Sequence, residues 1–183
     1  MMEESRFIAV LCSANDLDAK YTIPVKDFAN LLVKNKFDLV WGGTNKGLMK
    51  TVATIVQDGG RKLIGVTIPY FKDDARVNAD EMILTKTLGE RKALILDKSD
   101  AIVALVGGVG TLDEVMDMIE LRKIGVHNKP IIVLNTEHFY DGLKTQLQKM
   151  KDDGFISNNL DELICFADTP QEAIDYIKDN LPK

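Results

Sequence analysis

The chain has 183 residues, of which 45% are hydrophobic and 7% aromatic, a composition typical of one ordinary globular domain and unlike that of a disordered chain. Its 23 Lys and Arg against 28 Asp and Glu give a net charge of −5 and an isoelectric point near 5.1. This balance argues against nucleic acid or an anionic membrane as partner, because such surfaces attract basic patches.

Short apolar runs rich in β-branched residues recur along the chain and predict strands at residues 7–12, 37–41, 63–68, 101–106, 131–134 and 163–166. Most runs are apolar throughout, as is typical of strands that helices cover on both faces. The segments between them have apolar residues at helical spacing. This alternation predicts an α/β fold over residues 1–183: a single Rossmann-like, nucleotide-binding domain with a doubly wound, mostly parallel sheet and helices on both faces.

The least regular stretch, residues 69–90, is interpreted as a loop excursion, although residues 82–84 have the composition of an extra short strand. Loops held over a rigid sheet often carry function. This one is expected either to close over a ligand or to be a solvated connection.

Cys12 and Cys165 each lie in an apolar run, which favours free thiols in a reducing compartment. The acidic residues near the N-terminus are unlike a signal peptide, and the longest apolar run is about half of the roughly 20 residues that a membrane helix needs. Two histidines without neighbouring ligands predict no metal site. We therefore expect a cytoplasmic protein without membrane contact or bound metal.

Two glycine turns each follow a strand and precede a helical segment, at residues 42–47 (GGTNKG) and 107–111 (GGVGT). Glycine lets the backbone approach a ligand closely, and a helix N-terminus offers unpaired amides and partial positive charge. Each turn is therefore a candidate phosphate site, although glycines also serve tight βα turns without any ligand. Two such turns at one sheet edge favour a nucleotide.

Neither turn matches a standard nucleotide motif. Leu48 and Met49 occupy the positions of the lysine and hydroxyl residue of a P-loop, which argues against magnesium triphosphate chemistry. Asp113 stands where the dinucleotide fingerprint has its third glycine, which argues against a nicotinamide cofactor.

The segment from Thr111 to Glu114 has two interpretations. The spacing favours a capping box, with Thr111 as N-cap of a helix from Leu112 to about Ile124 and Glu114 as its partner. Alternatively, Glu114 lies at the mouth of the phosphate site, where a carboxylate stabilises positive charge on a ribose or orients water. Spacing does not choose between them.

The chain resembles the LOG family, the cytokinin riboside 5′-monophosphate phosphoribohydrolases once labelled lysine decarboxylases. The resemblance is carried by residues 89–93 (GERKA), 99–101 (SDA) and 106–114 (VGGVGTLDE). Further landmarks lie at residues 42–44 (GGT), 47–49 (GLM), 124–130 (IGVHNKP), 139–141 (FYD) and 153–156 (DGFI). The resemblance therefore extends over nearly the whole chain, with the motifs in the same order as in the family.

The resemblance implies cytokinin-activating hydrolysis of the N-glycosidic bond of a purine nucleoside 5′-monophosphate, AMP or an N6-substituted form, to free base and ribose 5-phosphate. It implies no cofactor, and a homodimer. The family's essential arginine and glutamate fall on Arg91 and Glu114, the expected catalytic residues. With the glycine turns, the expected substrate-binding residues are Gly42, Gly43, Lys92, Gly107, Gly108, Val109, Gly110, Thr111, Leu112 and Asp113.

Glu114 is the expected counter-charge to an oxocarbenium-like ribose, and Arg91 is expected to bind the phosphate or ribose side and keep Glu114 ionised. Without the resemblance, Arg91 would be interpreted as a surface ion-pair partner. The alternative function is a non-catalytic nucleotide or molybdenum-cofactor carrier, which has no use for an acid at the ribose. Lysine decarboxylation is less favoured, because no lysine has the setting of a pyridoxal Schiff base.

Two departures from the family leave substrate choice open. Val106 stands where a proline usually precedes the second glycine turn, and Glu120 stands where the family tends to have threonine. A charged residue at 120 either alters base preference or turns outward.

Overall fold

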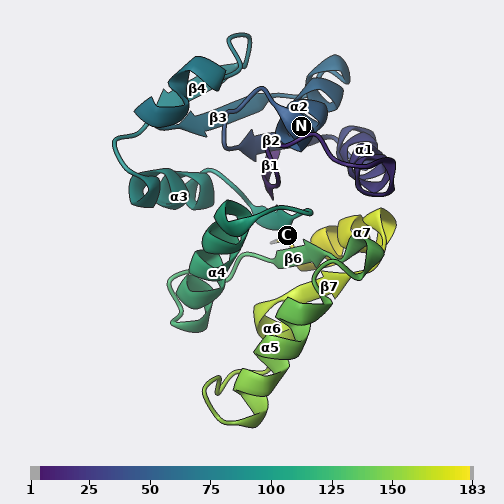
Figure 1. Cartoon of the computed structure of the whole chain (residues 1–183), viewed down its shortest axis with the longest axis vertical. Helices are drawn as coiled ribbons and strands as arrows, with labels where there is room; N and C mark the ends of the chain where they lie inside the picture. The colour runs from purple at the N-terminus through teal and green to yellow at the C-terminus, as the bar shows by residue number, and fades with distance from the viewer. Residues whose placement is uncertain (1–4, 182–183) are drawn as a thin grey trace.

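The computed structural model describes residues 5–181, which form one seven-stranded parallel sheet (Figure 1). Residues 1–4, which include the acidic Glu3 and Glu4 on which part of the cytoplasmic expectation rests, lie outside the described residues. The strand order is β4-β3-β2-β1-β5-β6-β7. The strands are β1 (Arg6–Leu11), β2 (Phe37–Trp41), β3 (Leu63–Thr67), β4 (Glu81–Leu84), β5 (Ala101–Ala104), β6 (Ile131–Leu134) and β7 (Cys165–Ala167).

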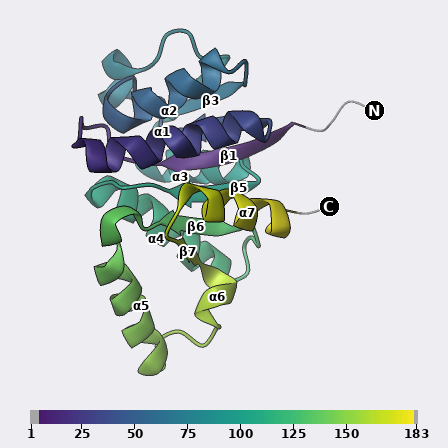
Figure 2. The same ribbon diagram turned by 90° about the vertical axis from the view of Figure 1, so that its right-hand side faces the viewer.

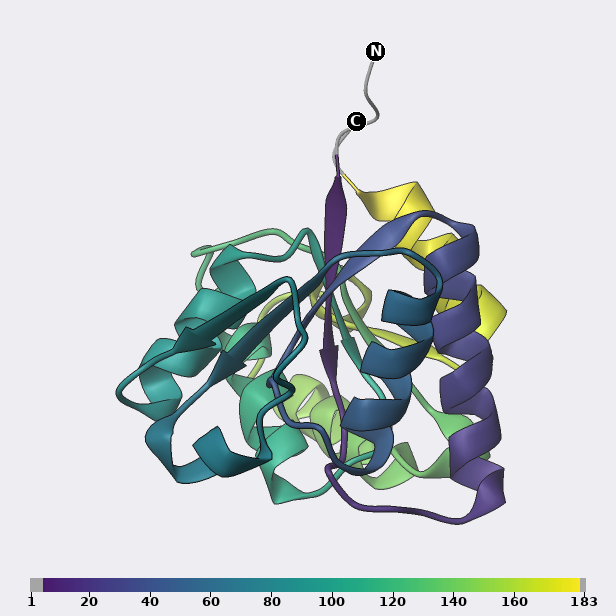
Figure 3. The same ribbon diagram turned by 90° about the horizontal axis from the view of Figure 1, so that it is seen from above.

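Helices cover both faces of the sheet, as Figures 2 and 3 show. On one face lie α1 (Ala19–Lys34), α2 (Gly47–Asp58) and α7 (Pro170–Asn180). On the other lie α3 (Leu88–Asp97), α4 (Val109–Lys123), α5 (Asp141–Asp152) and the short α6 (Leu160–Leu163). Two 3₁₀ helices, η1 (Pro69–Asp74) and η2 (Thr136–His138), lie in the connections. The predicted doubly wound, Rossmann-like fold is confirmed.

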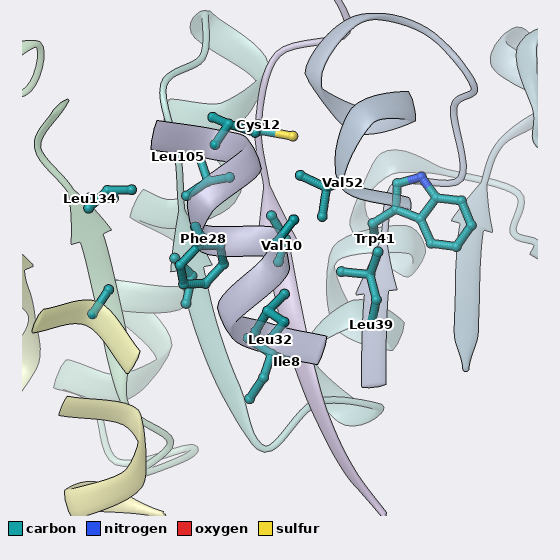
Figure 4. Packing of buried hydrophobic residues seen from close by; sticks show 14 of the residues in the cluster. Ile8, Val10, Cys12, Phe28, Leu32, Leu39, Trp41, Val52, Leu105 and Leu134 are labelled. Atoms are coloured by element: carbon teal, nitrogen blue, oxygen red, sulfur yellow. The ribbon is translucent and has the colours of Figure 1, made fainter. Parts of the chain in front are cut away.

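Alternation along β1 explains why this strand is apolar throughout. Ile8 and Val10 face α1, where Phe28 and Leu32 pack over them, and all four are buried (Figure 4). The intervening Ala9 contributes to the core on the other face. A strand with buried residues on both faces needs a helix layer on each side, so the apolar run fixes the three-layer arrangement.

The excursion at residues 69–90 is more ordered than its sequence predicts. It contains η1 and the edge strand β4, which pairs in parallel with β3. The extra short strand considered for residues 82–84 is therefore confirmed as β4, and the loop interpretation is wrong there. The pattern was faint because Glu81 and Leu84 are exposed and the strand has one neighbour.

Strand β1 lies between β2 and β5, although β5 follows about 90 residues later in the chain. Such a reversal of strand order opens a crevice at the carboxyl ends of the strands, where doubly wound sheets bind ligands. In Figure 3, β1 points toward this edge, at the bottom of the view. Among the described residues, no helix has both the length and the apolar character needed to cross a membrane.

Candidate active site

A cavity of about 400 Å³ opens at the carboxyl ends of β1, β2 and β5. Its walls come from the end of β1 and the following loop, the first glycine turn, η1, the start of α3 and the start of α4. These segments are distant in sequence and meet only because the strand order reverses between β1 and β5.

Arg91 enters this cavity from the first turn of α3. The helix begins after Thr87, whose side chain accepts a hydrogen bond from the Glu90 amide at 3.1 Å. The Arg91 guanidinium is buried: Nε donates to the Val66 carbonyl at 2.9 Å, and Nη1 donates to Oε1 of Glu114 at 2.5 Å. These anchors hold the guanidinium in one orientation, unlike that of a surface ion pair.

Gly42 makes room for the guanidinium. A Cβ at this position would lie 1.9 Å from Nη2 of Arg91 and 2.6 Å from Cε of Met49. Any larger residue would therefore push the arginine out of its place. Gly42 therefore contributes to the site because it has no side chain to occupy the space of the Arg91 guanidinium.

Glu114 lies on the second turn of α4, with its side chain 11% exposed. Burial raises the pKa of its carboxyl group above the ordinary value, although the charge and hydrogen bond of Arg91 act to lower it. Glu114 is thus a carboxylate whose ionised form depends on one arginine. Buried charges of this kind occur preferentially at functional sites.

The N-terminus of α4 is open to the cavity. Its N-cap residue Gly108 makes no side-chain capping bond, residues 108–110 are exposed, and Gly108 and Gly110 line the cavity. The first amides of a helix have no intrahelical acceptor and carry partial positive charge. A Cβ at Gly107 would lie 2.1 Å from Oγ1 of Thr111, so this glycine lets Thr111 pack inside the turn. The open helix N-terminus therefore presents backbone amides to the cavity in the way that suits an anion.

The capping-box interpretation of Thr111 and Glu114 is wrong. Helix α4 begins at Val109, after Gly108 as N-cap, so Thr111 lies inside the first turn. Glu114 pairs with Arg91 instead of with a capping amide. The glycines start the helix three residues earlier than the spacing predicted, because a helix N-terminus needs no side-chain cap where solvent or a ligand reaches its amides.

The first glycine turn differs from the second, because the chain itself covers its helix. The Met49 amide, in the first turn of α2, donates to the Ser13 carbonyl at 3.2 Å. Gly47 has a φ of +52°, and a Cβ there would lie 2.3 Å from the backbone of Ala14. The N-terminus of α2 is therefore packed against the loop after β1. Of the two expected phosphate sites, only the second presents an uncovered helix N-terminus.

Most of the expected site residues share the cavity. Its lining includes Arg91, Glu114, Gly42, Lys92, Gly108, Gly110, Thr111 and Asp113. Gly43, Gly107, Val109 and Leu112 lie in the same turns without lining the cavity. Lys92 bridges two acidic side chains of α4, with Nζ 3.1 Å from Oδ1 of Asp113 and 3.5 Å from Oδ1 of Asp117.

Further lining residues were not among the expected site residues: Ser13, Ala14 and Asn15 after β1, Lys46 and Met49 at the start of α2, Phe71 and Asp74 on η1, and Leu88 on α3. The position of residues 13–15 directly after a central strand was a usable signal, because ligands bind at such strand ends. For η1, the expectation that residues 69–90 either close over a ligand or form a solvated connection named neither Phe71 nor Asp74.

Glu120 turns outward. Its carboxylate is 2.5 Å from Nζ of Lys123, the glutamate side chain is 56% exposed, and neither residue lines the cavity. The charge at this position therefore does not face the site in this chain.

Cys12 lines the cavity as a buried free thiol, and Cys165 is also free. Burial, with the nearby Glu114 charge, raises the pKa of Cys12 well above that of an ordinary thiol. Because the thiolate is the reactive form, Cys12 is a wall residue and not a nucleophile. Within residues 5–181, no group of three or more His, Cys, Asp or Glu side chains is placed to hold a metal ion.

Comparisons with known structures agree with the architecture. The molybdenum cofactor binding protein of the phototrophic bacterium Rippkaea orientalis matches with a TM-score of 0.74 at 20% identity, over 96% of this chain and 97% of that one. The molybdenum cofactor carrier protein MCP of Chlamydomonas reinhardtii matches with a TM-score of 0.72 at 20% identity, over 96% and 98%. At this identity the likeness shows the fold alone.

Sequence comparisons are more specific. A family model described as "Possible lysine decarboxylase" matches residues 49–177. The cytokinin riboside 5′-monophosphate phosphoribohydrolase LOG2 of Arabidopsis thaliana is 35% identical over 190 residues, covering 100% of this chain and 89% of that protein. LOG4 of the same plant is 35% identical over 187 residues, covering 99% and 86%. The chain therefore belongs to the LOG family, whose members also match this family model.

Proposed function

We propose that this chain is an N-glycosyl hydrolase that converts a purine nucleoside 5′-monophosphate to free base and ribose 5-phosphate. One observation carries the proposal: the buried Arg91–Glu114 pair and the open N-terminus of α4 share one cavity. A phosphorylated ribose requires both an anion site and a carboxylate near its anomeric carbon. The names of the LOG relatives support a cytokinin riboside 5′-monophosphate, an N6-substituted form of AMP, as substrate, and AMP itself is the unsubstituted candidate.

Hydrolysis breaks the bond between C1′ of the ribose and N9 of the purine. The oxygen of a water molecule joins C1′, and a proton of that water passes to the departing base. Positive charge builds on the ribose as the bond lengthens, so a fixed carboxylate stabilises the transition state more than the ground state. Glu114 supplies this counter-charge and orients the water, and Arg91 keeps the carboxylate in place and ionised.

Substrate binding is assigned to the two glycine turns and to Lys92. The amides of residues 108–111 bind the 5′-phosphate, and Lys92 adds positive charge beside them. Gly107 and Leu112 shape this loop, and Gly42 and Gly43 shape the wall against which Arg91 lies. In this assignment the domain is a nucleotide-binding one that needs no cofactor.

We further propose a homodimer in the cytoplasm, an assembly that the LOG resemblance suggests. Apolar residues at helical spacing on and just after α4 lie in two different environments. Ile119 is buried in the core of the subunit, whereas Ile124, at the end of the helix, is 60% exposed and available for a subunit contact.

Incubation with a panel of nucleoside monophosphates tests the proposed function. We expect free base and ribose 5-phosphate from at least one purine 5′-monophosphate and none from the matching nucleoside, because the nucleoside lacks the group that α4 binds. Chromatography of the products detects the base directly. Nucleotide binding without any release of base would favour the alternative of a non-catalytic carrier.

Replacing Gly42 by alanine is expected to lower kcat about hundredfold, because the new Cβ displaces the Arg91 guanidinium and a shift of about 1 Å in a catalytic group costs this much. Steady-state kinetics measure the loss. Gly142→Ala is the matched control, since nothing lies within 4 Å of a Cβ at that position. Full activity of Gly42→Ala would contradict the placement of Arg91 in the site.

A further inference from the structure

Arg76 is a buried arginine outside the catalytic pair. It lies in the connection between η1 and β4 and is 8% exposed. Its guanidinium donates to neutral acceptors: Oε1 of Gln57 at 2.7 and 3.1 Å, Oδ1 of Asn45 at 3.0 Å and Oγ1 of Thr54 at 3.0 Å. None of the ion pairs between described residues includes it. A buried cation without a carboxylate is costly, so its bonds to three side chains need an explanation.

The backbone around Arg76 is tied to the first glycine turn. The Arg76 amide donates to the Gly43 carbonyl at 2.9 Å, and the Asn45 amide donates to the Asp74 carbonyl at 2.7 Å. Between these bonds Thr44 and Ala75 form an antiparallel bridge. Side chain and backbone together join residues 74–76 to the turn and to α2.

These ties determine where η1 lies. Phe71 and Asp74 of η1 line the cavity, and Asp74 also pairs with Lys46, with Oδ1 2.6 Å from Nζ. The Lys46–Asp74 pair is partly exposed and contributes little by itself. Arg76 is the buried part of the connection, and it therefore holds the η1 wall in place.

η1 follows β3 and the proposed anion site follows β5, and strands β2 and β1 lie between these two in the sheet. If the phosphate binds at residues 108–111 and the ribose lies beside Glu114, the remaining space is bounded by the loop after β1, the first glycine turn and η1. An aromatic ring and a carboxylate in this space suit a flat purine with hydrogen-bonding edges.

We infer that Arg76 is a positioning residue for recognition of the base: it fixes η1, with Phe71 and Asp74, as the wall that contacts the purine. This inference rests on the proposed function for the orientation of the nucleotide. Arg76 does not touch the substrate and acts through η1. Its loss therefore weakens binding of ligands that have a base and leaves binding of ligands without one unchanged.

The test compares AMP with ribose 5-phosphate, which lacks the base. Kd values are measured by calorimetry in a Glu114→Gln background, so that AMP is not consumed. We expect Arg76→Met to raise the Kd of AMP about tenfold and that of ribose 5-phosphate less than twofold. Lys72→Met, which removes a positive charge from exposed Lys72 on the same segment, is the control and leaves both Kd values within twofold.

A second variant, Gln57→Ala, keeps the arginine but removes two of its bonds, and covers the case in which Arg76→Met does not fold. It is expected to raise the Kd of AMP several-fold with the same selectivity. Equal changes for both ligands, or no change in a folded variant, would overturn the inference. Because the readout is binding, absence of turnover with every nucleotide would refute the proposed function while leaving this comparison intact.

Discussion

The Glu114→Gln variant is expected to lose about 10³-fold in kcat while its Kd for AMP changes little. Glutamine has nearly the shape of glutamate and still offers an oxygen to Nη1 of Arg91. It lacks the negative charge that opposes the cation developing at C1′, so the loss falls on the transition state. Measurement of kcat with saturating nucleotide, and of Kd by calorimetry, separates the two effects.

Stability must be followed in the same experiment, because the substitution leaves the buried Arg91 charge without its counter-ion. Breaking a buried pair costs about 3 kcal/mol, a large part of the 5–15 kcal/mol by which a domain is typically stable. Asp117→Asn removes one carboxylate from the same helix, outside the cavity, and is the matched control. A folded Glu114→Gln variant with the turnover of the parent would remove Glu114 from the mechanism.

The strands were predictable because of where they lie in the sheet. The central strands β1, β2 and β5 are buried on both faces, so apart from Arg6 and the buried Asp38 their sequences are apolar. For the edge strand β4, the sequence left both a loop and an extra short strand open. This strand has one neighbour and exposed ends, so burial leaves a weaker pattern in its sequence.

The site was only partly predictable, because local spacing carries no information about distant partners. The second glycine turn identified the N-terminus of α4, and family resemblance identified Arg91 and Glu114. That these two residues bond to each other depends on how α3 and α4 pack, as does the space for Arg91 beside Gly42. The capping-box error has the same origin. From the sequence alone, the position of Glu114 fits both a capping box with Thr111 and an ion pair with a distant residue.

The wall formed by η1 was only partly predictable. The sequence left open that residues 69–90 close over a ligand, but it did not identify Phe71 and Asp74 as the residues that line the cavity. Their segment is joined to residues 43–45 and to α2 by backbone hydrogen bonds and by the Arg76 side chain. In the sequence, Arg76 is one arginine in a polar stretch. Its role becomes visible from its burial and from acceptors that lie 19 to 31 positions away.

Replacing Arg91 by methionine is expected to lower kcat/KM about hundredfold at neutral pH and to move the acid limb of its pH profile to higher pH. Burial raises the pKa of Glu114, and the charge and hydrogen bond of Arg91 oppose that rise. Activity that needs ionised Glu114 is present above this pKa and is lost as the pH falls through it. Without Arg91, only the weaker effect of the Lys92 charge opposes burial, and the loss begins at a higher pH.

Arg91→Lys separates the contribution of charge from that of geometry. Lysine keeps a positive charge near Glu114 but cannot bond at once to the Val66 carbonyl and to the carboxylate as the guanidinium does. We therefore expect Arg91→Lys to return the acid limb most of the way to its original pH while the rate above that limb stays low. If Arg91→Met lowered the rate equally at every pH, Arg91 would act on the substrate and not on the ionisation of Glu114.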